Sequence, residues 1–521
     1  ALRSPCFEEV PPPKDFAVLV CPSAAPSTGV GLERRVQAKA PPRTSRLVLT
    51  LNLITASLGS GILSLPWAAA GASILLATML IVVVLVLNAG TVMILVVAAE
   101  RHQVFNLGKL IGVLPGHWGR PFRAFCDLVI WVSVFLSLIG YFIIVADSFE
   151  PFVRRAHLGT GVEHHSRDRF FAWLDQRSLI VALSALVALP LCFADQRRLA
   201  FSSTLSIAAN VYLVVLLLVQ FMGKPVATEL GEICVLGFGS GSITMVSVLM
   251  QAAIVQMCVL PMYEDLEDRS PRRFGTCLVC AFSFVILLYA SFASVAYFTY
   301  GPRVPSNVLQ ALPKGLISDI ARLGMAVAVL AVFPIMVISM VAPLQQAEQR
   351  AQRLGRIFTL PSPPFSRFST LDQSLVLGFG SIHTPEIDAV DALPGSLSAN
   401  RTDSRVATSV RITANACGRC WLYPSQLVTL VVVALSACSA AQILELGSVN
   451  VVSGALQVAA LFAIAPGLVG FHMVGLDSLP WRAAMVALIT GGIVMSFLGL
   501  SYTGNYVDEV EAHCVWPVLL Q

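Results

Sequence analysis

Charged residues are scarce in this chain: Asp, Glu, Lys and Arg make up 12% of its 521 residues. A soluble globular domain carries about 25%. Hydrophobic residues account for 56% of the sequence, and the mean hydropathy is +0.77. The net charge of +4 is too small to indicate a nucleic-acid partner. The composition therefore predicts an all-α polytopic membrane protein whose surroundings are a lipid bilayer.

The sequence also lacks the motifs of common catalytic and metal sites. It contains no Gly-x-Ser-x-Gly elbow, no phosphate-binding glycine loop and no metal-spaced set of His, Asp and Glu. We therefore expect neither an enzyme nor a metal or cofactor site. Cys417 and Cys420 form a lone CxxC, which is a weak signal. A disulfide between Cys234 and Cys514 stays open, because both fall on one side of the topology predicted below.

Long apolar segments predict about 11 transmembrane helices. We place them at about 47–70, 73–99, 122–148, 178–194, 200–222, 241–262, 275–299, 317–345, 425–444, 449–473 and 483–501. Eight helices thus fall within 47–345 and three within 425–501. Residues 1–46 and 346–424 are polar and lack a sustained apolar period, which predicts disordered segments. Residues 502–521 form a C-terminal tail.

Basic residues in the loops predict a cytoplasmic N-terminus and an extracytoplasmic C-terminal tail. The loop 149–177 disagrees, because it holds five arginines on the side predicted to be outside. The glycosylation sequon at Asn400 falls inside in this topology, where it stays unmodified. The host membrane is either the plasma membrane or a vacuolar or lysosomal membrane.

The first apolar segment is weak where a membrane helix should be strong. It carries Gly59, Ser60 and Gly61 near its middle and Pro66 shortly after. Glycine costs about 1 kcal/mol and proline about 3 kcal/mol in a helix interior. Broken backbone at membrane depth is tolerated where it is buried in protein or lines a wet cavity. Two interpretations stay open: a discontinuous helix that binds a small solute, and close helix packing through small residues.

The sixth apolar segment has a similar interruption. Gln251 and Gln256 lie in apolar sequence, and Pro261 follows in the last turn. Interrupted segments at matching positions of two halves indicate the binding site of a transporter. An ordinary proline kink is the alternative, and the two interruptions together favour the transporter.

Several segments resemble the amino acid/auxin permease family, and most closely its branch of sodium-coupled neutral amino acid transporters. The resemblance covers 47–345 well and 425–500 loosely. Its most specific parts are the first-helix stretch from Asn52 to Gly71 and the sixth-helix stretch from Val259 to Leu266. The resemblance implies a leucine transporter-like fold, with a 5+5 inverted repeat, discontinuous helices 1 and 6, and an eleventh helix.

The resemblance also implies a substrate site between helices 1 and 6. By position, the substrate-binding residues are Thr55, Leu58, Gly59, Ser60, Gly61, Gln256, Met257 and Cys258. Exposed amides at a half-helix N-terminus suit a carboxylate, and exposed carbonyls suit an ammonium. Ser133, Ser137 and Tyr141 on the third helix line the same cavity in this interpretation, whereas interhelical hydrogen bonding is favoured for each serine alone.

Sodium coupling conflicts with two features of the sequence. Thr55 stands where the sodium-coupled branch has an asparagine, and Leu330 and Val332 lie in a helix-8 run without any hydroxyl. Sodium needs several oxygen ligands, which alkyl side chains do not offer. We therefore expect proton coupling or exchange, with protons as the candidate coupling ion.

Ionisable residues within the spans are functional candidates. For Asp127, Asp147 and Glu264, solvation at the membrane interface is favoured, and His472 is favoured as a packing residue. The sequence thus predicts a secondary transporter of neutral amino acids. The alternative is a transporter-like amino acid sensor that signals through residues 1–46 and 346–424.

Overall fold

The computed structural model describes eight stretches of the chain. These are residues 44–115, 119–159, 176–193, 201–223, 233–358, 424–475, 478–504 and 507–518. The predictions for residues 1–43, Asn400, Cys417 and Cys420 lie outside the described residues, as does most of the segment 346–424.

The described chain is mostly helical. Its helices are α1 Arg46–Ala56, η1 Ser60–Ser64, α2 Leu65–Ala72, α3 Ile74–His102, α4 Leu107–Gly112, α5 Gly119–Gly159, α6 Gln176–Cys192, α7 Phe201–Gly223, α8 Gly241–Ala253, α9 Val259–Glu264, α10 Pro271–Tyr300, α11 Val308–Ala311, α12 Leu316–Phe358, α14 Pro424–Gln442, α15 Leu446–Gln457, η3 Val458–Ile464, α16 Ala465–His472, α17 Leu479–Ser501 and α18 Val507–Ala512. Two short strands, β1 Ile233–Gly237 and β2 Cys514–Val518, pair antiparallel.

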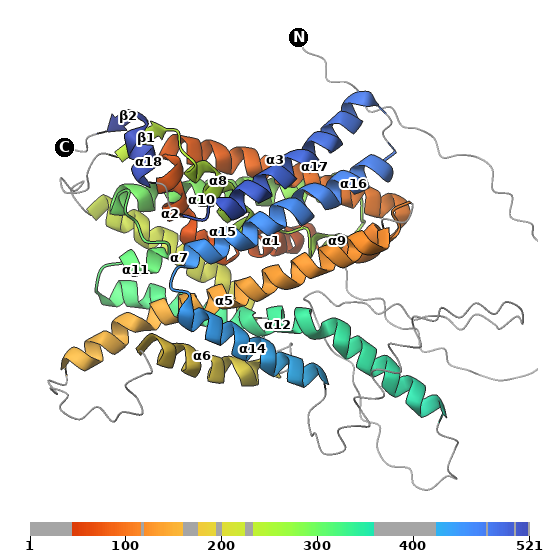
Figure 1. The fold of residues 1–521 in the computed structure, drawn as a ribbon, viewed down its shortest axis with the longest axis horizontal. Helices are drawn as coiled ribbons and strands as arrows, with labels where there is room; N and C mark the ends of the chain where they lie inside the picture. Colours follow the sequence, from red (N-terminus) through yellow and green to blue (C-terminus); the bar gives the residue numbers. More distant parts are fainter. Residues whose placement is uncertain are drawn as a thin grey trace, which may run out of the picture. The chain divides into compact units, whose positions relative to one another are not determined.

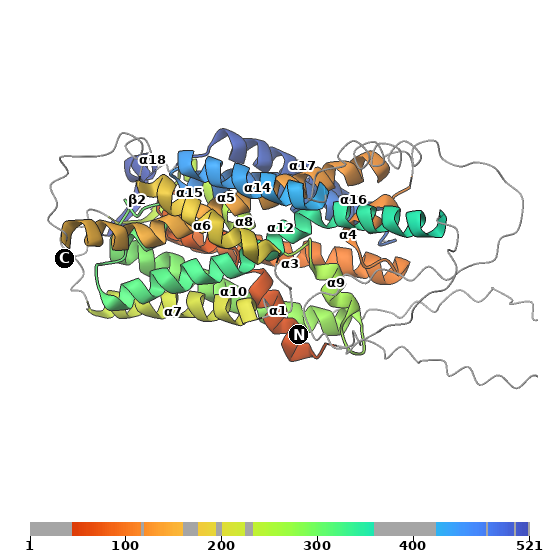
Figure 2. The same cartoon turned by 90° about the horizontal axis from the view of Figure 1, so that it is seen from below.

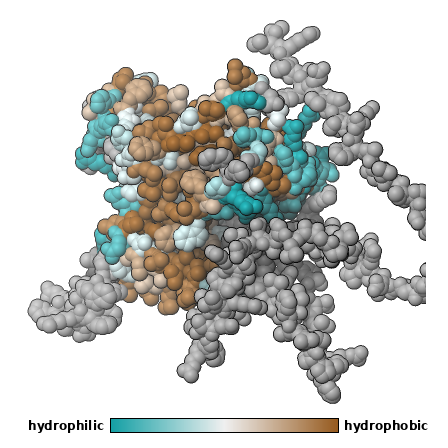
Figure 3. All heavy atoms as spheres, turned by 45° about the vertical axis from the view of Figure 1, so that its right-hand side comes forward, coloured by the Kyte–Doolittle hydropathy of each residue, from teal (hydrophilic) through white to brown (hydrophobic). Residues whose placement is uncertain are grey.

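Several of the helices are long and apolar enough to cross a membrane. Among the described residues, eight helices meet this test, or nine when the bent pair Arg46–Ala56 and Ser60–Ala72 counts as one span. The predicted fourth and sixth spans correspond to shorter apolar helices, Arg177–Cys192 and Gly241–Ala253. Figure 3 shows apolar residues in a broad band across one face, with polar residues toward its margins. The helical membrane class is confirmed, whereas the count of 11 and the inverted repeat stay predictions.

One predicted boundary needs correction. Helix α12 does not end at 345 but continues to Phe358. The added residues are rich in Gln, Ala and Arg, which are good helix formers and need no apolar face. At this extension the Glu348 carboxylate accepts hydrogen bonds from the N–H and the hydroxyl of Ser425, at 2.7 and 2.8 Å. A side chain of α12 thus caps the first turn of α14.

Strand β2 and helix α9 lie toward opposite ends of α3 (Figures 1 and 2). At one end, the N–H of Thr44 donates to the carbonyl of Asp265 at 2.8 Å, close to α9. At the other end, the Ser73 hydroxyl, just before α3, donates to the carbonyl of Gly237 in β1 at 3.1 Å. A helix of 29 residues spans about 43 Å, enough to cross a bilayer.

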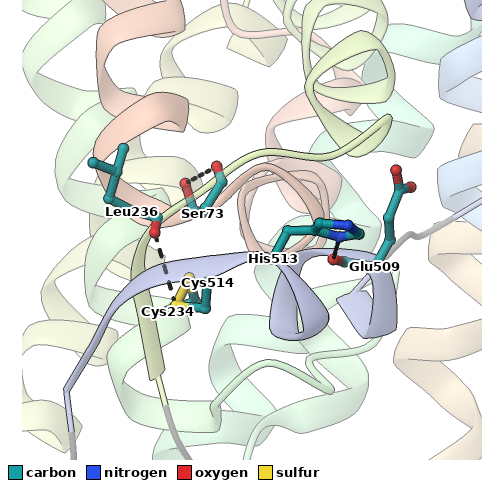
Figure 4. Close-up of a disulfide and its surroundings, with 7 residues drawn as sticks. Ser73, Cys234, Leu236, Glu509, His513 and Cys514 are labelled. Carbon is teal, nitrogen blue, oxygen red and sulfur yellow. Dashed lines mark hydrogen bonds between the residues drawn. A yellow bond between two sulfur atoms is a disulfide. The ribbon is translucent and has the colours of Figure 1, made fainter.

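Residues 502–504 and 507–518, here called the C-terminal strap, are fastened to the N-terminal end of α8. Cys514 forms a disulfide with Cys234, close to Ser73 (Figure 4). The Thr244 hydroxyl donates to the carbonyls of Tyr502 and Gly504, at 3.1 and 3.2 Å. The disulfide that the sequence left open is therefore present, and it joins β1 to β2.

The arginine-rich loop 149–177 carries paired charges. Arg154 lies 2.8 Å from Glu150, Arg155 lies 2.6 Å from Asp319, and Arg177 lies 2.7 Å from Asp147. Three of its five arginines are thus matched by acids, and Arg167 and Arg169 lie outside the described residues. The predicted orientation counts Lys and Arg alone, so it stays a prediction.

Candidate functional site

The first span is broken at Gly59. Helix α1 ends at Ala56, Gly59 is extended with φ −77° and ψ 176°, and η1 starts at Ser60. The two helical parts meet at 49°. The Ser57 hydroxyl donates to the carbonyl of Leu53, so this side chain bonds to the end of its own helix. The predicted discontinuity of helix 1 is confirmed.

The sixth span is broken between Ala253 and Val259. Helix α8 ends at Ala253, Ile254 is extended with ψ 116°, and the short helix α9 starts at Val259. A helix end leaves its last carbonyls without partners in the helix itself. Here Asn88 of α3 donates to the carbonyl of Ala253 at 2.9 Å. The predicted discontinuity of helix 6 is also confirmed.

The two breaks contact each other directly. The N–H of Gly59 donates to the carbonyl of Ala252 at 3.1 Å. The Tyr289 hydroxyl of α10 donates to the same carbonyl at 3.0 Å and also bonds the carbonyl of Ser57. A Cβ on Gly61 would lie 2.7 Å from the nitrogen of Ala252, so this approach requires glycine. Close packing and a broken helix therefore occur together, and the two interpretations of this stretch are compatible.

Gln256 faces α3. Its amide nitrogen bonds to Asn88 Oδ1 and donates to Thr91 Oγ1 at 3.1 Å, and its oxygen accepts from the N–H of Val255. The residue is fully buried. Its side chain therefore braces the second break against α3.

A buried polar cluster lies beside the breaks, between α5, α8 and α15. Gln457 donates to Gln251 at 3.0 Å, and Gln251 donates to the Ser137 hydroxyl at 3.0 Å. Ser137 donates to the carbonyl of Ser133 at 2.9 Å, and Ser453 donates to that carbonyl at 3.4 Å. The interhelical hydrogen bonding favoured for Ser137 is thus observed.

Three polar atoms in this region have hydrogen-bonding capacity to spare. Ser60 Oγ, Ser133 Oγ and Gln457 Oε1 are buried and have no hydrogen-bond partner. An unpaired buried polar atom is unfavourable by about 1–3 kcal/mol. Atoms of this kind at broken helices are suited to receive a polar solute.

The other predicted residues take varied positions. The Thr55 hydroxyl donates to the carbonyl of Leu51, within its own helix. Leu58 and Tyr141 are buried, and Met257 and Cys258 are half-buried in the second break. The structure brings together Gly59, Gly61 and the end of α8, with Ser137 bonded to Gln251 nearby, whereas Thr55 lies in the helix before the break.

Reasoning from the sequence missed several residues of this region. Tyr289 links both breaks, and Asn450 donates to the Ser64 hydroxyl at 2.9 Å, which ties α15 to η1. Gln457 precedes the π-helical stretch η3, and Pro466, which has no N–H to donate, follows it. The available signal was a polar side chain within an apolar run, because such a group needs a partner at membrane depth.

Asp147 corrects the expectation of interfacial solvation. It is 2% exposed, and it accepts hydrogen bonds from Arg177 and from Asn307, each at 2.7 Å. Helix α5 continues to Gly159, so Asp147 lies well inside it. Asp127 and Glu264 are exposed, as expected for interfacial residues.

A bundle of apolar helices with two facing breaks and buried polar groups defines a class, the membrane transporters. The sequence profile of the family described as transmembrane amino acid transporter protein matches residues 42–505. The chain belongs to this family. It is therefore an integral, multi-pass membrane protein and an amino acid transporter, and its family is not one of enzymes.

Individual relatives have low identity to the chain. It is 26% identical to amino acid transporter AVT3C of Arabidopsis thaliana over 57% of this chain and 69% of that protein. It is 24% identical to sodium-coupled neutral amino acid transporter 7 of Xenopus laevis over 60% of this chain and 68% of that protein. The solved structure of MhsT in complex with L-phenylalanine covers 89% of this chain and all of its own, with a TM-score of 0.44 and 10% identity.

Proposed function

We propose that the protein moves neutral amino acids across its membrane by alternating access, with the substrate bound at the two facing helix breaks. The observation that carries this proposal is the convergence of the breaks on one point. The carbonyls of Ser57 and Ala252 share the Tyr289 hydroxyl, and the N–H of Gly59 donates to Ala252.

The chemistry of the breaks suits an amino acid. Helices α1 and α8 both end at the gap, and helix C-termini carry partial negative charge that favours an ammonium. The chain re-enters helix at η1 and α2, whose first N–H groups favour a carboxylate. Ser60, with its unpartnered hydroxyl, stands at this start.

The preference for a neutral substrate follows from where the buried charges lie. Among the described residues, the buried charged side chains are Asp147, Asp319 and Arg322. Asp147 bonds Asn307, just before α11, and Arg322 bonds the carbonyls of Leu309 and Leu312. The side chains at the breaks and in the polar cluster are uncharged, so a charged substrate side chain would stay uncompensated there.

Proton coupling or exchange fits this chain better than sodium coupling. The Thr55 hydroxyl is engaged within its own helix, and Leu330 and Val332 offer no oxygen. We place the N-terminus in the cytoplasm, since Arg101, Arg269, Arg272 and Arg273 lie at the end of α3 where Thr44 pairs. The disulfide at the other end supports an extracellular or luminal C-terminal strap.

The test is uptake of labelled alanine and glutamine by proteoliposomes under an imposed pH gradient, with sodium and again with choline. Uptake in choline that follows the pH gradient supports a proton-coupled transporter. Counterflow without any gradient supports exchange. Uptake that requires sodium contradicts the interpretation of Thr55, Leu330 and Val332.

The sensor alternative is tested with the same preparation. It relies on residues 1–46 and 346–424, most of which lie outside the described residues. Binding of alanine without measurable flux in either salt would favour the sensor and overturn the proposed transport.

A further inference from the structure

Tyr289 occupies a particular place between the two broken helices. It lies within α10 and is fully buried. Its hydroxyl bonds the carbonyl of Ser57 at the end of α1 and the carbonyl of Ala252 at the end of α8. A side chain from a third, continuous helix thus joins the two helices that are discontinuous.

The Tyr289 hydroxyl donates fewer hydrogen bonds than the two carbonyls can accept. A tyrosine hydroxyl carries a single proton, so Ser57 and Ala252 must share it. Each carbonyl oxygen has two lone pairs, and each lies at the negative end of a helix dipole. The carbonyl of Ala252 accepts from Tyr289 and from the N–H of Gly59, so both of its lone pairs are used. The carbonyl of Ser57 accepts from Tyr289 alone among the described residues, so it has capacity for a cationic donor as well.

We propose that Tyr289 is a positioning residue for transport: its hydroxyl holds the carbonyl of Ser57 next to that of Ala252, so that the Ser57 carbonyl receives the ammonium of the amino acid. This inference rests on the proposed function, because it takes the facing breaks as the substrate site. Without the hydroxyl, the carbonyl of Ser57 is no longer held in place, and the ammonium meets a less well positioned acceptor.

Tyr297 provides a matched control on the same helix. It lies two turns further along α10, it is 1% exposed, and its hydroxyl bonds the backbone at Cys234. Tyr297→Phe removes one buried hydroxyl at the outer end of the protein, away from both breaks. Both variants keep the aromatic ring, so the packing of α10 is preserved.

The experiment measures KM and maximal rate of alanine uptake in proteoliposomes for native protein, Tyr289→Phe and Tyr297→Phe. We expect Tyr289→Phe to raise KM about tenfold, as loss of a hydrogen bond worth about 1.4 kcal/mol would. Its maximal rate should stay within about twofold, and Tyr297→Phe should leave KM within about twofold. An unchanged KM in Tyr289→Phe overturns the inference, as does an equal rise in both variants.

Two further measurements separate positioning from a general structural role. N-methylalanine, whose ammonium has one donor fewer than that of alanine, is tested as a competitor of alanine uptake. Native protein should prefer alanine to N-methylalanine, and this preference should be weaker in Tyr289→Phe. Replacement of Tyr289 by 4-aminophenylalanine restores a donor and should restore KM. Unchanged discrimination, or no rescue, overturns the inference. If native protein shows no uptake at all, the proposed function fails instead.

Discussion

The guanidinium of Arg177 in α6 donates to the carboxylate of Asp147 in α5 across 2.7 Å. The Asp147 side chain is fully buried and that of Arg177 is 11% exposed. Arg177 Nε and Nη2 are buried without partners, so Asp147 is the group that compensates its charge. Asn307 donates to the other carboxylate oxygen, which joins three segments at one point.

Breaking this pair should destabilise the protein strongly. Asp147→Asn leaves the Arg177 charge buried and uncompensated, and removing one partner of a buried pair costs about 3–5 kcal/mol. Asp127→Asn on the same helix is the control, because Asp127 lies 3.6 Å from Arg123 and its side chain is 56% exposed. That pair is worth about 0–1 kcal/mol. Thermal unfolding in detergent measures the stability of both variants. Equal losses of stability would contradict the conclusion that Asp147 compensates the charge of Arg177.

Gly61 and Gly90 should respond in opposite directions to the same substitution. A Cβ on Gly61 would lie 2.7–2.9 Å from backbone atoms of Ala252, which cannot move aside as a flexible side chain could. We expect Gly61→Ala to destabilise by about 1–3 kcal/mol through overpacking. A Cβ on Gly90 meets nothing within 4 Å, so Gly90→Ala should stabilise α3 by about 0.5–1 kcal/mol. The melting temperatures of both variants are compared with that of native protein. An unchanged melting temperature in Gly61→Ala would mean that the two breaks lie further apart than the structure shows.

Both breaks were predictable because a few residues close together in the sequence interrupt each helix. Gly59, Ser60 and Gly61 weaken the first span, and Pro261, which follows two glutamines in apolar sequence, marks the interruption of the sixth. The residues that brace the breaks were not predictable. Tyr289 lies on α10, and its contacts depend on the register between helices, which apolar periodicity does not specify.

The error on Asp147 has a similar origin. Its position near the end of an apolar run suggested an interfacial residue, yet the helix continues to Gly159. Its partner Asn307 is 160 residues away in sequence, so the pairing appears only after folding. The length of α12 was underestimated for a local reason, since polar helix formers extend a helix without any hydropathy signal.

The disulfide between β1 and β2 should stabilise the attachment of the C-terminal strap. Cys234 and Cys514 are 280 residues apart, and a crosslink that closes a long loop removes much unfolded-state entropy. We expect Cys234→Ser or Cys514→Ser to destabilise by about 2–4 kcal/mol, whereas Cys438→Ser, at an exposed free cysteine, should be neutral. Thermal unfolding measures this. Alkylation of denatured protein should modify Cys234 and Cys514 only after reduction, and modification without a reductant would refute the disulfide.

Glu509 should make the attachment of the C-terminal strap depend on pH. The hydroxyl and the N–H of Ser240, at the start of α8, donate to its carboxylate, and these bonds hold the pKa of Glu509 below its usual range. A carboxyl group whose pKa is lower in the folded state stabilises fully above its unfolded pKa, about 4.3. That contribution is lost as the pH falls through the lower, folded value.

The corresponding experiment compares native protein with Glu509→Gln, in which the side chain stays uncharged at every pH. Native protein should unfold at a higher temperature near about pH 6, and the difference should shrink as the pH falls below the unfolded pKa of about 4.3. Asp508→Asn is the control, because the neighbouring Asp508 is exposed, and it should show no such convergence. A difference between native protein and Glu509→Gln that is constant with pH would mean that the Glu509 charge does not hold the strap to α8.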